Sequence, residues 1–331
     1  MKKTIQKSNI IRNEIPIFFA VDDNYVPFLC VALQSLTDNC SERYDYRIHV
    51  LIEELSEESR RAIFSFRRKN VDIEFIDVRE KIRSLCAKLH LRDYYTKATY
   101  YRFFIPELFP QYDRGLYLDC DIVINCDIAR LYNCPMTNNI VAGIPEEVMT
   151  DIDVFGRYSE IVLGIDRNDY INAGIIVMNL KKMRKIGIEQ QFADLLGVRA
   201  CKVAQDQDYL NLICQGEIFY LNKKWNKTPM PDSNTSIMPN IVHYKINFKP
   251  WRYDNMPWRY DNIPYGEYFW AYAEKTEFYS MLREMKKNYS PAEMARDAMQ
   301  YNNLVALAEA EIFKEEAKRS HSFSNFCAEV V

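Results

Sequence analysis

Glycine and long apolar runs are what this sequence has little of. It contains nine glycines among 331 residues, against 23 tyrosines and 18 phenylalanines, whereas average glycine usage is roughly 7%. No apolar run approaches the ~20 residues that a membrane-spanning helix needs. We therefore expect a cytoplasmic protein without a membrane span, and we leave open a peripheral contact with the inner face of a membrane.

An excess of one charge is also missing. The formal net charge is −3, with 43 basic and 46 acidic side chains, which provides no field that would attract a polyanion. We therefore expect no nucleic-acid partner. The nine cysteines include no C-x-x-C pair, so they indicate reduced thiols and neither a disulfide framework nor a structural zinc site. The oligomeric state is left open.

Apolar runs alternate with helical patterns in the first part of the chain. Strands are expected at 15–21, 46–52 and 71–78, with a helix that begins near Ser56 between the second and the third. Strands that alternate with helices form a mostly parallel sheet covered on both faces, and ligands gather at the carboxyl ends of such strands. The sequence therefore predicts an α/β fold. Further strands are expected at 114–118, 140–144, 175–180 and 217–221, and further helices at 99–108, from 180 to about 198, and from 206.

The C-terminal part has a different pattern. Prolines and polar residues dominate 229–264, which predicts long loops, and charged helices are expected after residue 265. We therefore predict one α/β domain at 1–264 and a C-terminal helical extension at 265–331.

A short tandem repeat lies within the predicted loops. The segment PWRYDN at 250–255 occurs again at 257–262. Two copies are too few for a repeat architecture. We interpret the second copy as a tolerated insertion, with contact to an acceptor as the less favoured alternative.

Two carboxylates, Asp119 and Asp121, follow the predicted strand RGLYL directly. Alternate residues of an extended segment point to the same side, so the two side chains can bind one hard divalent cation. Such a cation stabilises negative charge on a leaving diphosphate. Capping or solvated acids are the alternative, but the position at a strand end favours a metal site.

His243 and Lys249 follow late in the chain. His243 ends the apolar segment IVHY, where a buried core histidine is the ordinary interpretation. As a third ligand beside the two acids, an imidazole would shift preference from Mg²⁺ toward Mn²⁺. Lys249 could reach a phosphate as a point charge, although a lone lysine usually lies at the surface.

Polar residues also border other buried segments. Arg102 lies among apolar neighbours, where an unpaired guanidinium is costly, so we expect an anionic partner from the protein or from a phosphate. The amides and acids of 172–174 and 206–208 could bind sugar hydroxyls. Helix capping explains Asp206 equally well.

Six ordered segments of the chain resemble glycosyltransferase family 8. This family consists of retaining enzymes with the GT-A fold, such as bacterial lipopolysaccharide galactosyl- and glucosyltransferases. The resemblance covers about residues 16 to 251 and implies a Rossmann-like, mostly parallel sheet flanked by helices. The six segments are AVDDNY, ATYYRFFIPELF, YLDCDIVI, NAGIIVMNLKKMR, DQDYLN and HYKINFKPW.

The resemblance also implies roles for individual residues. It implies transfer of galactose or glucose from UDP-galactose or UDP-glucose to a saccharide or glycolipid acceptor, with Mn²⁺, or alternatively Mg²⁺, as the cofactor. The nucleotide would be held by Ala20, Asp22, Asn24, Tyr25 and Lys249. The metal ligands would be Asp119, Asp121 and His243. The donor sugar would contact Arg102, Asn172, Ala173, Asp206 and Gln207, and Glu146 aligns with an acid near the sugars.

One position departs from the family pattern. The family reads His-Tyr-x-Gly-x-x-Lys-Pro-Trp, and here the glycine position is Ile246. A β-branched residue disfavours positive φ, so we expect the loop to close in a different shape and donor binding to be weak.

Retention of configuration through two displacements would need a protein nucleophile. Glutamine is a poor nucleophile, so we favour attack by the acceptor hydroxyl on the same face. The leaving phosphate would act as the base, Gln207 would stabilise the transition state, and Asp206 and Glu146 would orient hydroxyls. Two alternatives remain. The LDCDIV segment also fits the nucleophile motif of haloacid-dehalogenase-type phosphohydrolases, and a non-catalytic sugar-nucleotide-binding protein fits the altered loop.

Overall fold

A seven-stranded sheet forms the centre of the computed structural model, which describes residues 13–83, 85, 89, 97–230, 238–252 and 263–329, with side chains to residue 320. The strand order is β3-β2-β1-β4-β7-β6-β8. All neighbouring strands pair in parallel except β7, which is antiparallel to both β4 and β6. The strands of this sheet are β1 (Asn13–Ala20), β2 (Tyr44–Ile52), β3 (Val71–Asp77), β4 (Gly115–Leu118), β6 (Val141–Gly143), β7 (Ile175–Met178) and β8 (Ile218–Tyr220).

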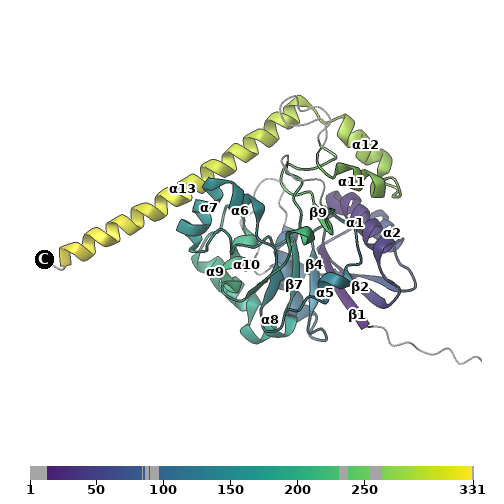
Figure 1. Cartoon of the computed structure of the whole chain (residues 1–331), viewed down its shortest axis with the longest axis horizontal. Helices are drawn as coiled ribbons and strands as arrows, with labels where there is room; N and C mark the ends of the chain where they lie inside the picture. The colour runs from purple at the N-terminus through teal and green to yellow at the C-terminus, as the bar shows by residue number, and fades with distance from the viewer. Residues whose placement is uncertain are drawn as a thin grey trace, which may run out of the picture.

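A second, two-stranded sheet pairs β5 (Ile122–Ile124) with β9 (Ile241–His243) in antiparallel orientation. Helices cover both faces of the large sheet, with α1 and α2 at one side and α8, α9 and α10 at the other (Figure 1). The helices up to residue 225 are η1 (Asp23–Tyr25), α1 (Val26–Asn39), α2 (Glu57–Phe64), α3 (Arg79–Arg83), η3 (Lys97–Phe103), α4 (Ile105–Leu108), α5 (Ala129–Tyr132), α6 (Glu147–Asp151), α7 (Asp153–Arg157), η4 (Tyr158–Leu163), α8 (Leu180–Ile186), α9 (Ile188–Val198), α10 (Asp206–Cys214) and η5 (Lys223–Trp225).

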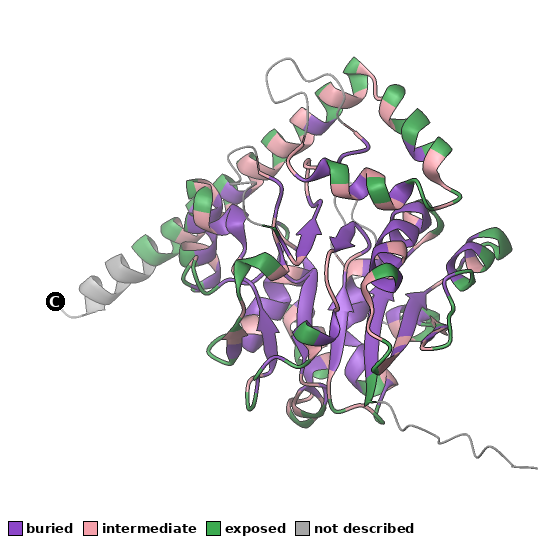
Figure 2. Cartoon of the chain, turned by 45° about the vertical axis from the view of Figure 1, so that its right-hand side comes forward, coloured by how far each residue is buried: buried purple, intermediate pink, exposed green. Residues whose placement is uncertain are grey.

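The expected strands are all present, and the mostly parallel α/β architecture is confirmed. The strands are buried because their apolar runs pack against helices on both faces, as the purple ribbons in Figure 2 show. One apolar cluster lies between the sheet and α1, α2 and α5. The other lies between the sheet and η3, α4 and the helices from α6 to α10. Burial on both faces explains why parallel strands have continuous apolar runs in the sequence.

Two predicted helices are divided in the structure. The helix expected from residue 180 to about residue 198 is two helices in the structure. Gly187, with a φ of 64°, ends α8, and α9 begins at the next residue. A left-handed glycine is the usual way to end a helix. The segment 99–108 forms the 3-10 helix η3 followed by α4, and Pro106 lies in the first turn of α4. Proline fits there because its missing N–H has no partner in a first turn.

Three helices follow the predicted loops. They are α11 (Gly266–Ala273), α12 (Tyr279–Lys287) and α13 (Pro291–Glu329). α13 runs beside α6 and α7 and contacts α7 and η4 (Figure 1). The boundary between a domain at 1–264 and an extension stays a prediction. Most of the PWRYDN repeat, residues 253–262, lies outside the described residues.

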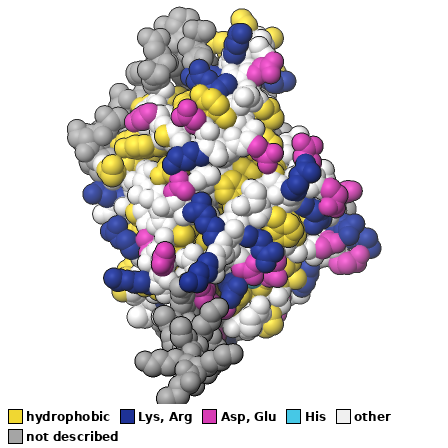
Figure 3. Space-filling view, turned by 90° about the vertical axis from the view of Figure 1, so that its right-hand side faces the viewer, with side chains coloured by type: hydrophobic (Ala, Val, Ile, Leu, Met, Phe, Trp, Pro, Cys, Tyr) yellow, Lys and Arg dark blue, Asp and Glu magenta, His cyan; other side chains and the backbone are white. Residues whose placement is uncertain are grey.

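The outer surface is mixed in charge on the face shown in Figure 3, where basic and acidic side chains alternate. No helix within the described parts of the chain is long and apolar enough to cross a membrane.

Candidate active site

A cleft lies at one edge of the large sheet. Its volume is about 1400 Å³ when the part open to solvent is included. β1 and β4 are parallel, so Ala20, the last residue of β1, and Asp119, the residue after β4, lie at the same edge. β7 runs the other way, so the segment before it, 172–174, lies at this edge too. Twelve of the fourteen predicted site residues line the cleft, and Asn24 and Lys249 are the two that do not. The twelve are Ala20, Asp22, Tyr25, Arg102, Asp119, Asp121, Glu146, Asn172, Ala173, Asp206, Gln207 and His243.

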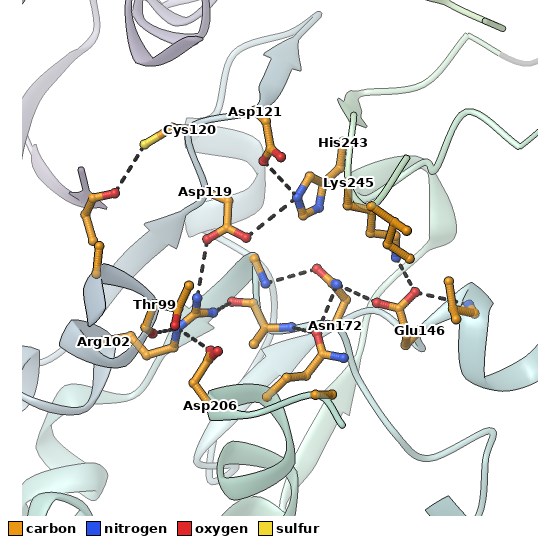
Figure 4. A pocket seen from close by; sticks show the side chains of 18 of the residues that line it. Thr99, Arg102, Asp119, Cys120, Asp121, Glu146, Asn172, Asp206, His243 and Lys245 are labelled. Atoms are coloured by element: carbon orange, nitrogen blue, oxygen red, sulfur yellow. Dashed lines mark hydrogen bonds and ion pairs between the residues drawn. The ribbon is translucent and has the colours of Figure 1, made fainter. Parts of the chain in front are cut away.

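The three predicted metal ligands converge in this cleft (Figure 4). His243 Nε2 lies 3.1 Å from Asp121 Oδ1 and 3.6 Å from Asp119 Oδ2. One ligand atom from each residue lies within 4.8 Å of the others. Neighbouring ligand atoms of a six-coordinate Mg²⁺ or Mn²⁺ are separated by about 3 Å. The three side chains therefore fit one divalent cation of this size.

Backbone pairing explains the convergence. Asp121 precedes β5, and β9 places His243 opposite Ile122, while the Asp119 N–H donates to Gly174 O at 2.7 Å. A Cβ on Gly174 would lie 2.3 Å from Asp119 Oδ2 and 2.5 Å from His243 Cε1. Only glycine lets the two ligands approach at this position.

A second layer of hydrogen bonds orients the imidazole. His243 Nδ1 lies 3.1 Å from Asn226 Oδ1, and Asn226 Nδ2 donates to Asn172 Oδ1 at 2.8 Å. When Nδ1 carries the proton that this amide oxygen accepts, the lone pair of Nε2 faces the two acids. Asn226 was not among the predicted site residues.

The charge of Asp121 is strongly stabilised. Burial alone would raise the pKa of this carboxyl, but Lys249 and His243 hold the pKa well below its usual range. Lys249 Nζ lies 2.6 Å from Asp121 Oδ2 and donates to Tyr244 O at 3.0 Å. Lys249, only 1% exposed, is therefore paired with a predicted metal ligand, and its contact with a diphosphate stays a prediction.

Arg102 has the anionic partner that its apolar neighbourhood predicts, and this partner comes from the protein. Its Nε lies 3.2 Å from Asp206 Oδ2 and its Nη2 3.4 Å from Asp119 Oδ1. The guanidinium also lies over the ring of Tyr117, 4.2 Å from its centroid. Burial raises the pKa of Asp206 to about 6, against the opposing effect of Arg102.

Amide side chains connect the predicted donor-sugar residues. Gln207 Oε1 accepts hydrogen bonds from Asn172 Nδ2 at 3.1 Å and from Ala173 N at 3.0 Å. Asn172 Nδ2 also donates to Glu146 Oε2 at 2.5 Å. The oxygen of Gln207 is thus held against the segment before β7, which fixes the orientation of the side chain.

Glu146 lies at the same edge because it follows β6, and its side chain caps α6 by accepting from Val148 N at 3.1 Å. It is paired with Lys245, a buried cleft residue that was not predicted. Burial alone would raise the pKa of Glu146, but Lys245 lowers it below its usual value. Glu146 is therefore held as a carboxylate.

The residues predicted to hold the nucleotide lie around η1. Asp22 caps this 3-10 helix, with Tyr25 N donating to its Oδ1 at 3.2 Å. Ala20 ends β1 and accepts a hydrogen bond from the Cys120 thiol at 3.3 Å. Asn24 is exposed within η1 and lies outside the cleft lining. The structure brings Ala20, Asp22 and Tyr25 to the cleft and leaves Asn24 outside it.

Ile246 adopts the conformation that we expected it to avoid. Its φ is 55°, at the second position of a turn closed by the hydrogen bond from Phe248 N to Lys245 O, 3.1 Å long. Such a φ favours glycine. The turn keeps this shape because Lys245 on one side is paired with Glu146 and Lys249 on the other with Asp121. The expectation that Ile246 avoids positive φ is therefore wrong. The different shape of loop closure and the weak donor binding stay predictions. Ile246 lines the cleft and packs against the larger apolar cluster, away from Trp251.

Sequence reasoning missed three features of the cleft. Asn226 and Lys245 act through partners 17 and 99 residues away, and no local pattern marks such pairs. The third is one face of α13, because Gln300, Tyr301 and Leu304 line the cleft as well. The helical spacing of these three residues was readable, but not the surface that they face.

The sequence is similar to bacterial proteins over most of its length. A Haemophilus influenzae protein is 27% identical over 215 residues, which are 64% of this chain and 63% of that protein, so the chain spans less than two thirds of that relative. The Lipopolysaccharide 1,2-glucosyltransferase of Escherichia coli K12 is 23% identical over 270 residues, covering 74% of this chain and 75% of that protein.

Solved structures support the same fold. The galactosyltransferase LgtC, solved in complex with donor and acceptor sugar analogs, has a TM-score of 0.63 and 25% identity over 80% of this chain and 96% of LgtC. The bifunctional glycosyltransferase WbbM has a TM-score of 0.71 and 22% identity over 83% of this chain and 52% of WbbM. The predicted GT-A fold class is confirmed. The model of the family "Glycosyl transferase family 8" matches residues 16–255, more than half of the chain, and the protein therefore belongs to glycosyl transferase family 8.

Proposed function

We propose that the protein is a retaining hexosyltransferase that transfers galactose or glucose from a UDP-sugar to a saccharide or glycolipid acceptor, with Mn²⁺ as the metal and Mg²⁺ as the alternative. The observation that carries the proposal is the convergence of Asp119, Asp121 and His243 in a cleft. Family membership supports a sugar-transfer reaction and a metal.

The residues present fit the metal. Two carboxylate oxygens and one imidazole nitrogen face one point, and the Nδ1 contact with Asn226 favours the tautomer that a ligand needs. Mixed oxygen and nitrogen ligands favour Mn²⁺ over Mg²⁺. A divalent cation bound there would act as a Lewis acid and stabilise the negative charge of the leaving UDP.

We propose that Lys249 contacts the diphosphate of the donor. Its Nζ lies 2.6 Å from Asp121 Oδ2, next to the proposed metal ligands. We propose that Ala20, Asp22, Asn24 and Tyr25 hold the uridine on the η1 side of this point. Arg102, Asn172, Ala173, Asp206 and Gln207 would hold the donor sugar on the other side.

Attack on the same face of the sugar fits the carboxylates of the cleft. A double displacement needs a carboxylate that is available as a nucleophile. Glu146 is paired with Lys245 and caps α6, and Asp206 is paired with Arg102. Both acids are thus committed to cations of the protein. We propose that they orient hydroxyls, that Gln207 stabilises the transition state, and that the leaving phosphate accepts the proton of the acceptor.

A panel of UDP-sugars tests the proposal. Release of UDP from UDP-galactose or UDP-glucose with Mn²⁺, and its loss with EDTA, is the expected result. The anomeric coupling of the product in NMR should show an α linkage formed from the α-linked donor. A β product would contradict retention. Binding of UDP-sugar without any release of UDP would instead favour the non-catalytic alternative.

The match to family 8 gives no support to the phosphohydrolase alternative. Location in the cytoplasm and contact with the inner face of a membrane are proposals that fractionation of source cells would test.

A further inference from the structure

One face of α13 forms a wall of the cleft. Gln300, Tyr301 and Leu304 line the cleft. Ala308 and Ile312 lie further along the same face and belong to the larger apolar cluster. Spacings of three and four residues place side chains on one side of a helix. One face of α13 therefore packs against the rest of the protein. The N-terminal part of this face lines the cleft, and the part after it is buried in the apolar cluster.

Ion pairs and hydrogen bonds hold this wall on both sides of the cleft-lining residues. Before them, Asp297 lies 3.1 Å from Arg252 Nη1 and accepts from the Tyr289 hydroxyl at 2.6 Å. After them, Arg157 lies 3.2 Å from Glu316, and Arg319 donates to Ile161 O at 2.7 Å. The wall is therefore placed by the fold and does not depend on a single contact.

The wall also connects to the loop beside the metal ligands. Arg252 N donates to Lys249 O at 3.0 Å, and Arg252 is the residue that pairs with Asp297 of α13. The beginning of α13 is thus joined to the segment that carries Lys249. We call the cleft residues Val148, Met149, Phe155, Gln300, Tyr301 and Leu304 the α13 end of the cleft.

The α13 end combines apolar surface with polar groups. The Tyr301 ring lies 6.5 Å from that of Phe155 in an edge-to-face arrangement, and Tyr301 is only partly buried. Gln300 offers an amide, and the Glu146–Lys245 pair borders the same space. Sugars have an apolar face and a rim of hydroxyls, so an exposed aromatic ring beside amides and charged groups suits them.

The position of this end relative to the metal ligands indicates which sugar binds there. The proposed uridine residues lie around η1, which leads into α1, and Figure 1 shows α1 on the opposite side of the sheet from α6 and α7. Asp119 follows β4 and His243 ends β9, and both strands lie between these helices in the view of Figure 1. A UDP-sugar with its uridine at η1 would therefore direct its transferable sugar toward Gln207 and Glu146. Among the described residues, the α13 end is the part of the cleft that lies beyond that sugar.

We propose that the α13 end is the acceptor subsite, in which Tyr301 stacks on the apolar face of an acceptor sugar and Gln300 hydrogen-bonds its hydroxyls. This inference rests on the proposed function and adds to it the part of the chain that selects the acceptor. Tyr301, Gln300 and Leu304 are specificity-determining residues of the C-terminal helix.

The test compares Tyr301→Ala with Tyr301→Phe and with Met299→Ala, which removes an exposed side chain from the same turn of α13. The full-length chain is assayed with Mn²⁺ and UDP-galactose or UDP-glucose, with methyl β-galactoside, methyl β-glucoside and lactose as acceptor probes. Tyr301→Ala should raise the KM of the transferred probe about three- to tenfold, while UDP release without a probe changes less. Tyr301→Phe and Met299→Ala should keep the wild-type KM.

Saturation-transfer NMR of the same probes, with UDP and Mn²⁺ present, provides a readout that does not need catalysis. Wild type and Met299→Ala should show saturation of the probe, and Tyr301→Ala should lose it. A wild type that releases no UDP would contradict the proposed function, whereas this NMR difference would still support the subsite. An unchanged KM and unchanged saturation in a Tyr301→Ala variant with wild-type Tm would overturn the inference. So would the absence of saturation from every probe with wild type.

Discussion

The metal end of the cleft takes its side chains from strand ends, whereas the α13 end takes them from helix faces. Asp119, Asp121 and His243 are attached to β4, β5 and β9, and Gly174 lets them meet. At the α13 end Phe155 and Tyr301 belong to helices that pack side by side. Backbone hydrogen bonds between strands set the distances among strand-end residues, whereas side-chain packing sets the distance between two helices.

The difference teaches where this molecule can vary. The metal end tolerates no extra atom at Gly174, and its charges neutralise one another within about 4 Å. The α13 end has apolar side chains, which are buried at Val148, Met149 and Phe155 and partly buried at Tyr301 and Leu304, and one amide. These side chains can change without leaving a buried charge unpaired. We expect substitutions at the metal end to affect every reaction of the protein, and those at the α13 end to affect the acceptor alone.

The largest effect is expected from Asp119→Asn and Asp121→Asn. Each change removes one metal ligand, and Lewis-acid stabilisation of several kcal/mol corresponds to about 10³-fold in rate. UDP release and transfer should both fall by this order, while the Tm stays near wild type. Asp113→Asn, at an exposed acid before β4, is the control. Near-normal turnover in both site variants would refute the metal assignment.

Gly174→Ala should come next. The added Cβ would lie 2.3 Å from Asp119 Oδ2 and 2.5 Å from His243 Cε1, so the ligands must move apart, and a displacement of about 1 Å can reduce a rate about 100-fold. Mn²⁺ binding, followed by electron paramagnetic resonance, should weaken. Gly197→Ala is a matched control because nothing lies within 4 Å of a Cβ there. Equal Mn²⁺ affinity in the two variants would show that the close approach is unimportant.

Asn226→Ala should have a smaller effect. It removes the partner of His243 Nδ1 but none of the ligands, and loss of such a partner reduces metal affinity about tenfold. Calorimetry of Mn²⁺ binding measures the change. Asn222→Ala, which removes only the cap of η5, should bind Mn²⁺ like wild type. Wild-type affinity in Asn226→Ala would mean that the ring is oriented by packing alone.

The smallest effect is expected at Ile246, where glycine relieves the positive φ of 55°. A left-handed conformation costs a non-glycine residue about 1 kcal/mol, so Ile246→Gly should tighten UDP binding about fivefold if the turn shape is needed for binding. Ile246→Ala is the control, since it removes the same cleft contacts and keeps the Cβ. Calorimetry with UDP and Mn²⁺ compares them. Weaker binding in the glycine variant than in the alanine variant would reject the role of strain.

Local patterns predicted those parts of the site that follow a strand directly. Asp119 and Asp121 come after the apolar run of β4, and alternation along an extended segment places both carboxylates close to His243. Arg102 had to find an anion because of its apolar neighbours, and it contacts Asp206. For Ile246 the residue preference was read correctly, but the ion pairs on either side of the turn override it.

By itself the sequence determined the buried strands, their alternation with helices and the two acids at a strand end. Each of these features depends on residues that are only a few positions apart in the chain. Only the tertiary structure decided that Asn226 orients His243, that Lys245 pairs with Glu146, and that α13 walls the cleft. These contacts join residues from 17 to more than 100 positions apart. The energies of these contacts depend on which surfaces the fold brings together. A local periodicity in the sequence carries no information about pairs of residues so far apart.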